Sequence, residues 1–277
     1  MADADPRPPV LHISSCMAPL ADPYVGNLAR WLSDQIDRPI EFVESTGWRA
    51  REHLFDHGQI DLIWICGLPY VRKADDPSMD VQLVAAPVMA GSRYQKRPVY
   101  FSDVVVRRES PYRTFADLRG ASWAFNEPGS HSGFNLTRYQ LARVGEDWSY
   151  FGRVVGAGSH QTCVAMVQNG EIEAAAIDST VLELMKNAEP GVLDDLRTIA
   201  SFGPSPIPPW LARAGLDGEI LRQVQAAFIE MDRSERGCQL MAAIGQRCFV
   251  PVEDADYDLI REMDQQAASV RPLGGTE

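Results

Sequence analysis

The sequence predicts an α/β protein made of two lobes. Short apolar runs alternate with amphipathic stretches along most of the chain, which is typical of strand–helix units and not of all-α or all-β folds. This alternation restarts near residue 100 and breaks again in a proline-rich stretch after residue 200. We therefore expect residues 99–203 to form a second lobe, and residues 10–98 and 204–277 to form the first lobe together. The two chain crossings between the lobes can serve as hinges.

The first segment contains the expected elements of an open sheet. Strands are predicted over residues 10–14, 40–43, 60–65 and 81–87, and helices over residues 23–36 and 48–57. Gly58 is expected to end the second helix, and another helix is expected to start in the Cys66-Gly67-Leu68-Pro69 sequence.

The central segment has the same alternation. Strands are expected over residues 99–107, 121–125, 151–155 and 173–177, and helices over residues 134–144 and 159–169. Irregular structure is predicted for residues 203–209, because proline lacks the amide hydrogen that helices and sheets use. The remainder is expected to be helical, over residues 218–233 and 235–245 and from about residue 254.

The composition excludes several classes of protein. With 277 residues, 45% hydrophobic content and no low-complexity run, the chain is expected to be an ordered globular protein. The formal net charge is −12 and no Lys- and Arg-rich run is long enough to follow a phosphate backbone, so nucleic acid is not an expected partner. No stretch approaches the ~18 apolar residues of a membrane-spanning helix, so the chain is not expected to span a membrane.

The N-terminus and the cysteines bear on the compartment. The opening sequence MADADPRPPV has no basic start followed by an apolar run, as an export signal would. Five cysteines without a CxxC pair indicate reduced thiols better than a disulfide framework or a zinc site. Neither a metal nor a cofactor is expected. As written, the sequence predicts a cytoplasmic protein, and a removed signal peptide or a misassigned start would make it periplasmic.

The most informative segment is Ser130-His131-Ser132-Gly133, which joins a predicted strand to a predicted helix. The first N–H groups of a helix have no partner within the helix, and the helix dipole favours negative charge there. The serine hydroxyls add donors, and a protonated His131 would add a charged donor. The pattern predicts an anion site, although it equally fits a Ser130 that only caps the helix and a Gly133 that only relieves crowding.

Two further junctions are expected at the same edge of the predicted sheet. Ser159 and His160 stand at the start of another helix, and Asp178 follows the strand over residues 173–177. Open α/β sheets bind ligands beyond the carboxyl ends of their strands, so these groups are expected to converge. Asp178 would accept a hydrogen bond from a protonated ligand oxygen or an amine. The alternative is that these residues cap helices or lie on the surface.

Several segments together resemble the phosphate-, phosphite- and phosphonate-binding receptors of ATP-driven uptake systems. They occur in that family's order over about residues 10–260, at residues 58–62, 98–106, 115–120, 127–133, 158–160, 175–179 and 204–208. The resemblance implies a type II periplasmic-binding-protein fold that closes its lobes on a small oxyanion (phosphate, phosphite or a phosphonate) and serves an ABC permease in uptake or sensing.

The resemblance also implies roles for individual residues. Ser130, His131 and Ser132 would occupy the family's Ser-Thr-Ser anion loop, His160 would be an imidazole donor, and Asp178 would be the acidic residue facing the ligand. His131 replaces the family's threonine, so one hydroxyl donor is lost and a titratable group is gained. Candidates for the family's aromatic contacts from the first lobe are Tyr70, Tyr94 and Trp64, each of which also fits a core or rim position.

Two alternative functions remain open at this point. Cys16, Cys66 and Cys163 are expected near the cleft, and some relatives are thought to sense arsenite through cysteine, although buried free cysteines are usually only small apolar residues. A cytoplasmic enzyme or sensor reusing the bilobal fold is the other alternative. His131, His160, Asp178 and nearby serines could compose a Ser-His-Asp set, but the sequence has no Gly-x-Ser-x-Gly elbow, metal-ligand spacing or Gly-rich nucleotide loop. We therefore expect a binding protein rather than an enzyme.

Overall fold

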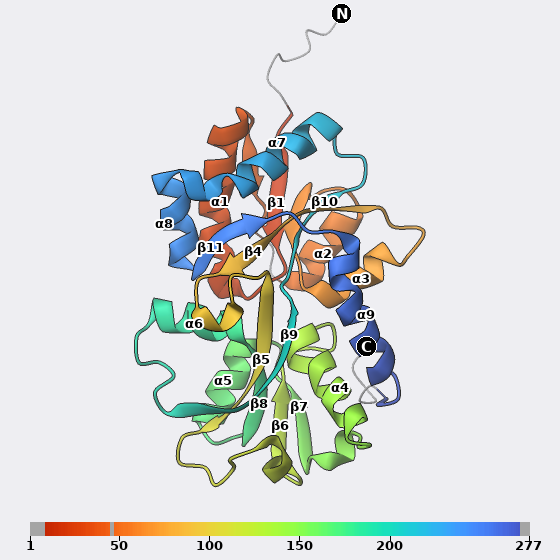
Figure 1. Ribbon diagram of the computed structural model, residues 1–277, viewed down its shortest axis with the longest axis vertical. Helices are drawn as coiled ribbons and strands as arrows, with labels where there is room; N and C mark the ends of the chain where they lie inside the picture. Colours follow the sequence, from red (N-terminus) through yellow and green to blue (C-terminus); the bar gives the residue numbers. More distant parts are fainter. Residues whose placement is uncertain (1–8, 45–46, 272–277) are drawn as a thin grey trace, which may run out of the picture.

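The computed structural model describes residues 9–44 and 47–271 and consists of two lobes, each built on one mixed sheet (Figure 1). The strand order is β11-β4-β10-β3-β1-β2 in the first sheet and β7-β6-β8-β5-β9 in the second. The first sheet contains β1 (Leu11–Ser15), β2 (Ile40–Phe42), β3 (Leu62–Trp64), β4 (Val81–Met89), β10 (Trp210–Arg213) and β11 (Gln246–Val250). The second contains β5 (Val99–Arg107), β6 (Ser122–Phe125), β7 (Arg153–Gly156), β8 (Ala174–Asp178) and β9 (Leu196–Pro206). The predicted two-lobed α/β class is confirmed.

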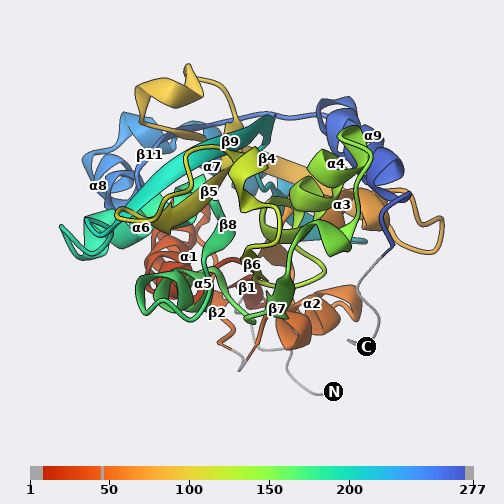
Figure 2. The same ribbon diagram turned by 90° about the horizontal axis from the view of Figure 1, so that it is seen from below.

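Helices flank each sheet. The first lobe carries α1 (Asp22–Ile36), α2 (Trp48–Asp56), α3 (Gly67–Ala74), α7 (Gly218–Ile229) and α8 (Glu235–Ala243). The second carries α4 (Leu136–Arg143), α5 (His160–Gln168) and α6 (Ser179–Ala188). The last helix, α9 (Asp258–Ala267), packs against α3 of the first lobe and α4 of the second, as two perpendicular views show (Figures 1 and 2). The C-terminal helix therefore lies across both lobes.

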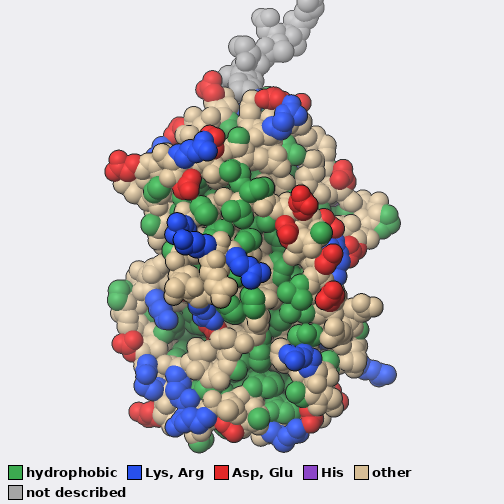
Figure 3. Space-filling model, viewed as in Figure 1, with side chains coloured by type: hydrophobic (Ala, Val, Ile, Leu, Met, Phe, Trp, Pro, Cys, Tyr) green, Lys and Arg blue, Asp and Glu red, His purple; other side chains and the backbone are tan. Residues whose placement is uncertain are grey.

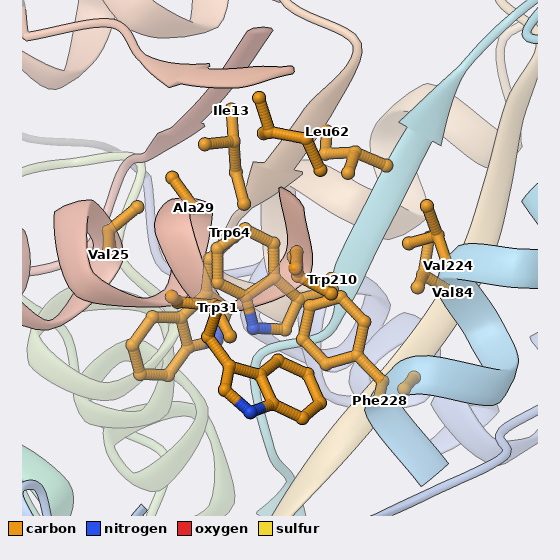
Figure 4. Close-up of a cluster of buried hydrophobic side chains, with 14 of the residues drawn as sticks. Ile13, Val25, Ala29, Trp31, Leu62, Trp64, Val84, Trp210, Val224 and Phe228 are labelled. Carbon is orange, nitrogen blue, oxygen red and sulfur yellow. The ribbon is translucent and has the colours of Figure 1, made fainter. Parts of the chain in front are cut away.

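The largest core of the first lobe surrounds two stacked tryptophans (Figure 4). The ring centroids of Trp64 and Trp210 lie 5.8 Å apart with an interplanar angle of 15°, and Phe228 of α7 lies 5.4 Å from Trp210. The helix α1 adds Val25 and Leu28, which are fully buried because residues three or four apart share one helix face. This packing holds the last residue of β3, Trp64, against the first residue of β10, Trp210.

The chain crosses between the two sheets from β4 to β5 and again from β9 to β10. A small apolar cluster packs at these crossings, and it includes Met89, Tyr94, Tyr100 and Ile207. On the face shown in Figure 3, Lys and Arg side chains lie scattered among Asp and Glu over both lobes. Within the part of the chain that the structure describes, no helix is both long and apolar enough to cross a membrane.

The prediction of irregular structure over residues 203–209 is wrong for residues 203–206, because β9 continues to Pro206. Within its sheet β9 pairs only with β5, so its other edge needs no amide donors and tolerates proline. The short strands β10 and β11 are absent from the sequence-based expectation. The strand β10 follows the proline-rich stretch, β11 lies directly after a helix, and both join the sheet by pairing with β4, which is distant in the sequence.

Candidate anion-binding site

A cavity of about 420 Å³ lies between the lobes, and both lobes contribute to its wall. The lining residues of the first lobe are Ser15, Cys16, Met17, Ala18, Pro19, Asp22, Glu44, Gly47, Trp48, Arg51 and Cys66. Those of the second lobe are Asn126, Glu127, Ser130, Ser132, Gly158, Ser159, His160, Gln161, Asp178 and Val181.

Most of the lining follows the carboxyl ends of parallel strands. In the first lobe, β1 pairs in parallel with β3, and the next residues, including Cys16 and Cys66, reach the cavity. In the second lobe, β6 pairs in parallel with both β7 and β8, and Asn126, Gly158 and Asp178 stand at the ends of these strands. Parallel strands end at the same sheet edge, so the two sheets present their polar edges to one another.

Six helical segments of the described chain begin at this cavity. In the first lobe these are α1, α2 and α3, whose starts bring Asp22, Trp48 and Cys66 to the wall. In the second lobe they are α5, α6 and a π-helical turn, η4 (His131–Asn135), that leads directly into α4. Each helix start carries up to about half a positive charge, so the cavity is electrostatically suited to an anion.

The serine pair at η4 combines capping with free donor capacity. Ser130 Oγ accepts a hydrogen bond from the Gly133 amide at 3.0 Å, so Ser130 does cap the helix. The same hydroxyl still has its own hydrogen to donate, and Ser130 lines the cavity. Ser132 Oγ lies 3.3 Å from His160 Nε2 and also lines the cavity. Capping and anion binding are therefore compatible at this turn.

The other two junctions of the second lobe also combine both features. Ser159 Oγ accepts from the Thr162 amide at 3.0 Å, and Asp178 Oδ1 accepts from the Thr180 amide at 2.8 Å. Burial lowers the pKa of His160 to about 4, so its imidazole is neutral near pH 7. Burial raises the pKa of Asp178 to about 6, although hydrogen bonds from Thr180 oppose the shift. These residues, predicted to converge, do lie around one cavity.

His131 does not line the cavity and is not a charged donor. Its ring is fully buried, with Nε2 3.2 Å from Ser205 Oγ and Nδ1 3.3 Å from Asn135 Nδ2. Burial lowers the pKa of His131 to about 3, and the positive charge of Arg72 adds to the effect. The charged donor that a protonated His131 would add is therefore not present at neutral pH, because the ring faces the interior beside Ser205 of β9. Its backbone amide donates to Cys66 Sγ across the lobes at 3.4 Å.

The first lobe contributes groups that the sequence did not single out. Arg51 forms a bidentate ion pair with Asp22, with both nitrogen–oxygen distances at 2.6 Å. Among the described lining residues it is the only Lys or Arg. Trp48 reaches across to Gly129, where an added Cβ would lie 3.4 Å from the indole Cη2. The sequence predicted a helix over residues 48–57, but it did not reveal that the start of this helix would face the second lobe.

Glu127 is another lining residue that the sequence did not single out. Burial raises the pKa of its carboxyl group to about 8, Glu52 raises it further and Arg49 opposes the shift. Glu127 is therefore predominantly a neutral carboxylic acid near pH 7, able to donate a hydrogen bond.

Comparison with known proteins identifies the family. Residues 24–257 match the model of a family described as ABC transporter, phosphonate, periplasmic substrate-binding protein. The chain belongs to this family. Its members are substrate-binding proteins, which agrees with a cavity built of donors between two lobes.

Two curated relatives and one solved structure illustrate the family. The probable ABC transporter phosphite binding protein PhnD1 of Prochlorococcus marinus is 21% identical over 87% of this chain and 82% of its own length. The phosphonates-binding periplasmic protein of Escherichia coli is 25% identical over 74% of this chain and 60% of its own length. The structure of PhnD1 in complex with methylphosphonate superposes with a TM-score of 0.82 at 19% identity, covering 94% of this chain and 99% of PhnD1. This likeness shows the fold.

The three aromatic candidates do not line the anion cavity of this family member. Tyr70 donates to Asp254 at 2.7 Å, and Tyr94 donates to Glu183 at 2.6 Å. Trp64 donates from its indole nitrogen to the Pro208 carbonyl at 3.0 Å and stacks on Trp210. Their polar atoms are engaged in holding elements together, as expected of core or rim aromatics.

The cysteines do not form a thiolate site. Cys16 and Cys66 line the cavity, whereas Cys163 is fully buried in an apolar cluster of the second lobe. Burial raises the pKa of Cys66 to about 11, so it is a thiol, the form that soft metalloids bind less well. The described residues contain no group of three or more His, Cys, Asp and Glu placed to hold a metal ion.

The Ser132–His160 pair lacks the arrangement of a catalytic triad. Among the described residues, His160 Nδ1 has no hydrogen-bond partner, whereas a triad orients this nitrogen with a carboxylate. Asp178 instead accepts from Thr180 at its own helix start. The arrangement can hold an anion but has no activated nucleophile.

Proposed function

We propose that this chain binds the oxyanion headgroup of a phosphonate or phosphite in the interlobe cavity and delivers it to an ABC permease from the periplasm. The observation that carries the proposal is the convergence of six helix starts, with the Ser130 and Ser132 hydroxyls, on one cavity. The description of the family as periplasmic supports the periplasm over the cytoplasm, the two compartments that the sequence left open.

The charges of the cavity favour a singly charged ligand that keeps a proton. The guanidinium of Arg51 is already paired with Asp22, so helix dipoles and neutral donors supply much of the stabilisation. Asp178 is buried at the wall and can accept a hydrogen bond from a P–OH group when it is ionised. A fully ionised oxyanion would instead face an uncompensated carboxylate, which is unfavourable at low local dielectric.

Two contacts between the lobes lie beside the cavity and favour the closed arrangement of the lobes. The His131 amide reaches Cys66 Sγ, and Trp48 packs near Gly129, so both contacts join an anion-loop segment to the first lobe. A ligand that touches both walls would stabilise this closed arrangement by its differential affinity for the closed state.

A thermal-shift series tests the proposal. The purified protein is mixed with phosphite, phosphate, methylphosphonate, 2-aminoethylphosphonate, sulfate or arsenite at increasing concentration. A ligand at ~100 times its Kd adds about 2.7 kcal/mol of apparent stability. We expect phosphite or a phosphonate to give the largest shift. No shift with any of the phosphorus oxyanions, or a larger shift with sulfate or arsenite, would overturn the proposal.

A further inference from the structure

An apolar crevice adjoins the anion cavity. Its volume is small, about 20 Å³, but it shares the wall residues Met17, Ala18 and Val181 with the cavity. The rest of its wall is mostly apolar and includes Trp64 and Leu184. The two spaces are therefore neighbours that meet at the same three side chains.

The crevice is formed by both lobes. Trp64 comes from β3 of the first lobe, whereas Val181 and Leu184 come from α6 of the second. The indole nitrogen of Trp64 is satisfied by the Pro208 carbonyl, so the ring has no polar group left to satisfy in the crevice. A ligand portion placed here would contact both lobes and would contribute to closure.

The crevice begins at the wall of the anion cavity. Val181 lies in the first turn of α6, which Asp178 caps, and Met17 directly follows the lining residue Cys16. Val181 lines both spaces, and Leu184 lies three residues further along α6, on the same helix face. Methionine side chains are flexible and adapt to different shapes, so Met17 and Met89 allow the crevice to widen.

We propose that this crevice receives the carbon substituent of an organophosphonate, and that the protein prefers phosphonates with an apolar chain over phosphite and methylphosphonate. The inference rests on the proposed function, since it places the headgroup in the anion cavity. A cavity of about 420 Å³ is within the ~300–1,000 Å³ typical of sites for small organic molecules, whereas phosphite is a single tetrahedral group. Each methylene buried in the crevice should improve affinity about fourfold.

Calorimetric titration of a chain-length series tests the proposal. Phosphite, methylphosphonate, propylphosphonate and hexylphosphonate are compared with the unmodified protein. We expect propylphosphonate to bind at least about tenfold more tightly than methylphosphonate, because two more methylenes are buried. Equal or weaker binding of the longer chains, with methylphosphonate still bound, overturns this inference alone. Failure of every phosphorus ligand overturns the proposed function itself.

Variants on α6 then locate the chain. Leu184→Asp puts a charge into the crevice without touching the anion cavity, and Asn187→Asp places the same charge on the exposed surface of the same helix. We expect Leu184→Asp to abolish the preference for propylphosphonate while methylphosphonate affinity changes less than about twofold, and Asn187→Asp to preserve both. Leu184→Ala, which introduces no charge, should reduce the propyl-to-methyl ratio about threefold. An unchanged ratio in both Leu184 variants would place the chain elsewhere and overturn the assignment.

Discussion

Gly133 lies so close to Asn126 that no side chain fits between them. A Cβ added to Gly133 would overlap Asn126 Oδ1 and would lie 3.1 Å from His160 Cε1. Asn126 and His160 both line the anion cavity, whereas Gly133 stands behind them. Glycine at this position therefore leaves room for two cavity side chains. The sequence left open whether Gly133 relieves crowding or belongs to an anion site, and these two interpretations are compatible.

Gly133→Ala should weaken ligand binding and destabilise the fold. The added methyl group must push Asn126 or His160 from its place, and overpacking of this kind typically costs about 1–3 kcal/mol. We expect at least about a tenfold loss of affinity by calorimetry. Gly218→Ala is the control, because its nearest neighbour would be Arg222 Nη1 at 3.7 Å, an ordinary contact. Full affinity in Gly133→Ala would show that neither side chain takes part in binding.

Ser132→Ala and Ser130→Ala should each remove one donor to the anion. A hydrogen bond to a charged acceptor contributes about 1.5–3 kcal/mol, so each variant should bind roughly 10- to 150-fold more weakly. Ser130→Ala should also lose about 1 kcal/mol of stability, because its hydroxyl caps the Gly133 amide. Ser269→Ala, on the exposed surface, serves as the control. Wild-type affinity in both cavity variants would exclude this turn as the anion site.

The fold was predictable from the sequence where an apolar pattern was clear and was bounded by turn residues. The helix α1 shows apolar residues three and four apart, and β5 is a nine-residue segment rich in valine and aromatic residues, so both were predicted closely. The strand β10 directly follows the proline-rich stretch, and its own four residues do not mark it as a strand. Its place between β3 and β4 results from how two distant segments of the chain associate.

Only the part of the site that the second lobe contributes was predictable from the sequence. Ser130, His160 and Asp178 follow strands of the same sheet, so sheet topology alone brings them together. Trp48 and the Arg51–Asp22 pair face them from the other lobe, and no local pattern encodes how two lobes are oriented. Whether His131 carries a charge could not be predicted, because its sequence neighbours do not reveal that the ring is buried.

Asp178→Asn should stabilise the ligand-free protein at neutral pH. Burial raises the folded pKa of Asp178 to about 6, above the ~3.9 of an unfolded chain, so the native state binds more protons between these values. The contribution of this carboxyl to the free energy of unfolding therefore falls as pH rises from about 4 to 6 and stays low above. Asparagine can still cap α6 but carries no charge.

We expect Asp178→Asn to gain about 3 kcal/mol at pH 7.5 and little at pH 4 in urea unfolding. The exposed Asp80→Asn variant should show no such pH-dependent gain. A gain of the same size at both pH values would mean that burial of the Asp178 charge is not its cause.

Glu127 should make ligand binding weaken at alkaline pH. Its carboxyl, with a pKa raised to about 8 by burial, is predominantly neutral at pH 7 and becomes negative above pH 8. A neutral acid can donate to the anion, whereas a carboxylate repels it, so the bound state favours the protonated form and affinity falls as pH rises. Glu127→Gln keeps a neutral donor at every pH.

The affinity ratio of wild type to Glu127→Gln cancels the ionisation of the ligand itself. We expect this ratio to be constant from pH 6 to 7 and to fall up to about tenfold per pH unit above pH 8. Glu189→Gln, on the exposed surface, should follow the wild-type profile throughout. If the ratio for Glu127→Gln is the same at pH 6.5 and pH 9, the Glu127 carboxyl does not face the bound anion, and the alkaline loss of affinity must be sought in the ligand or in another group of the cavity.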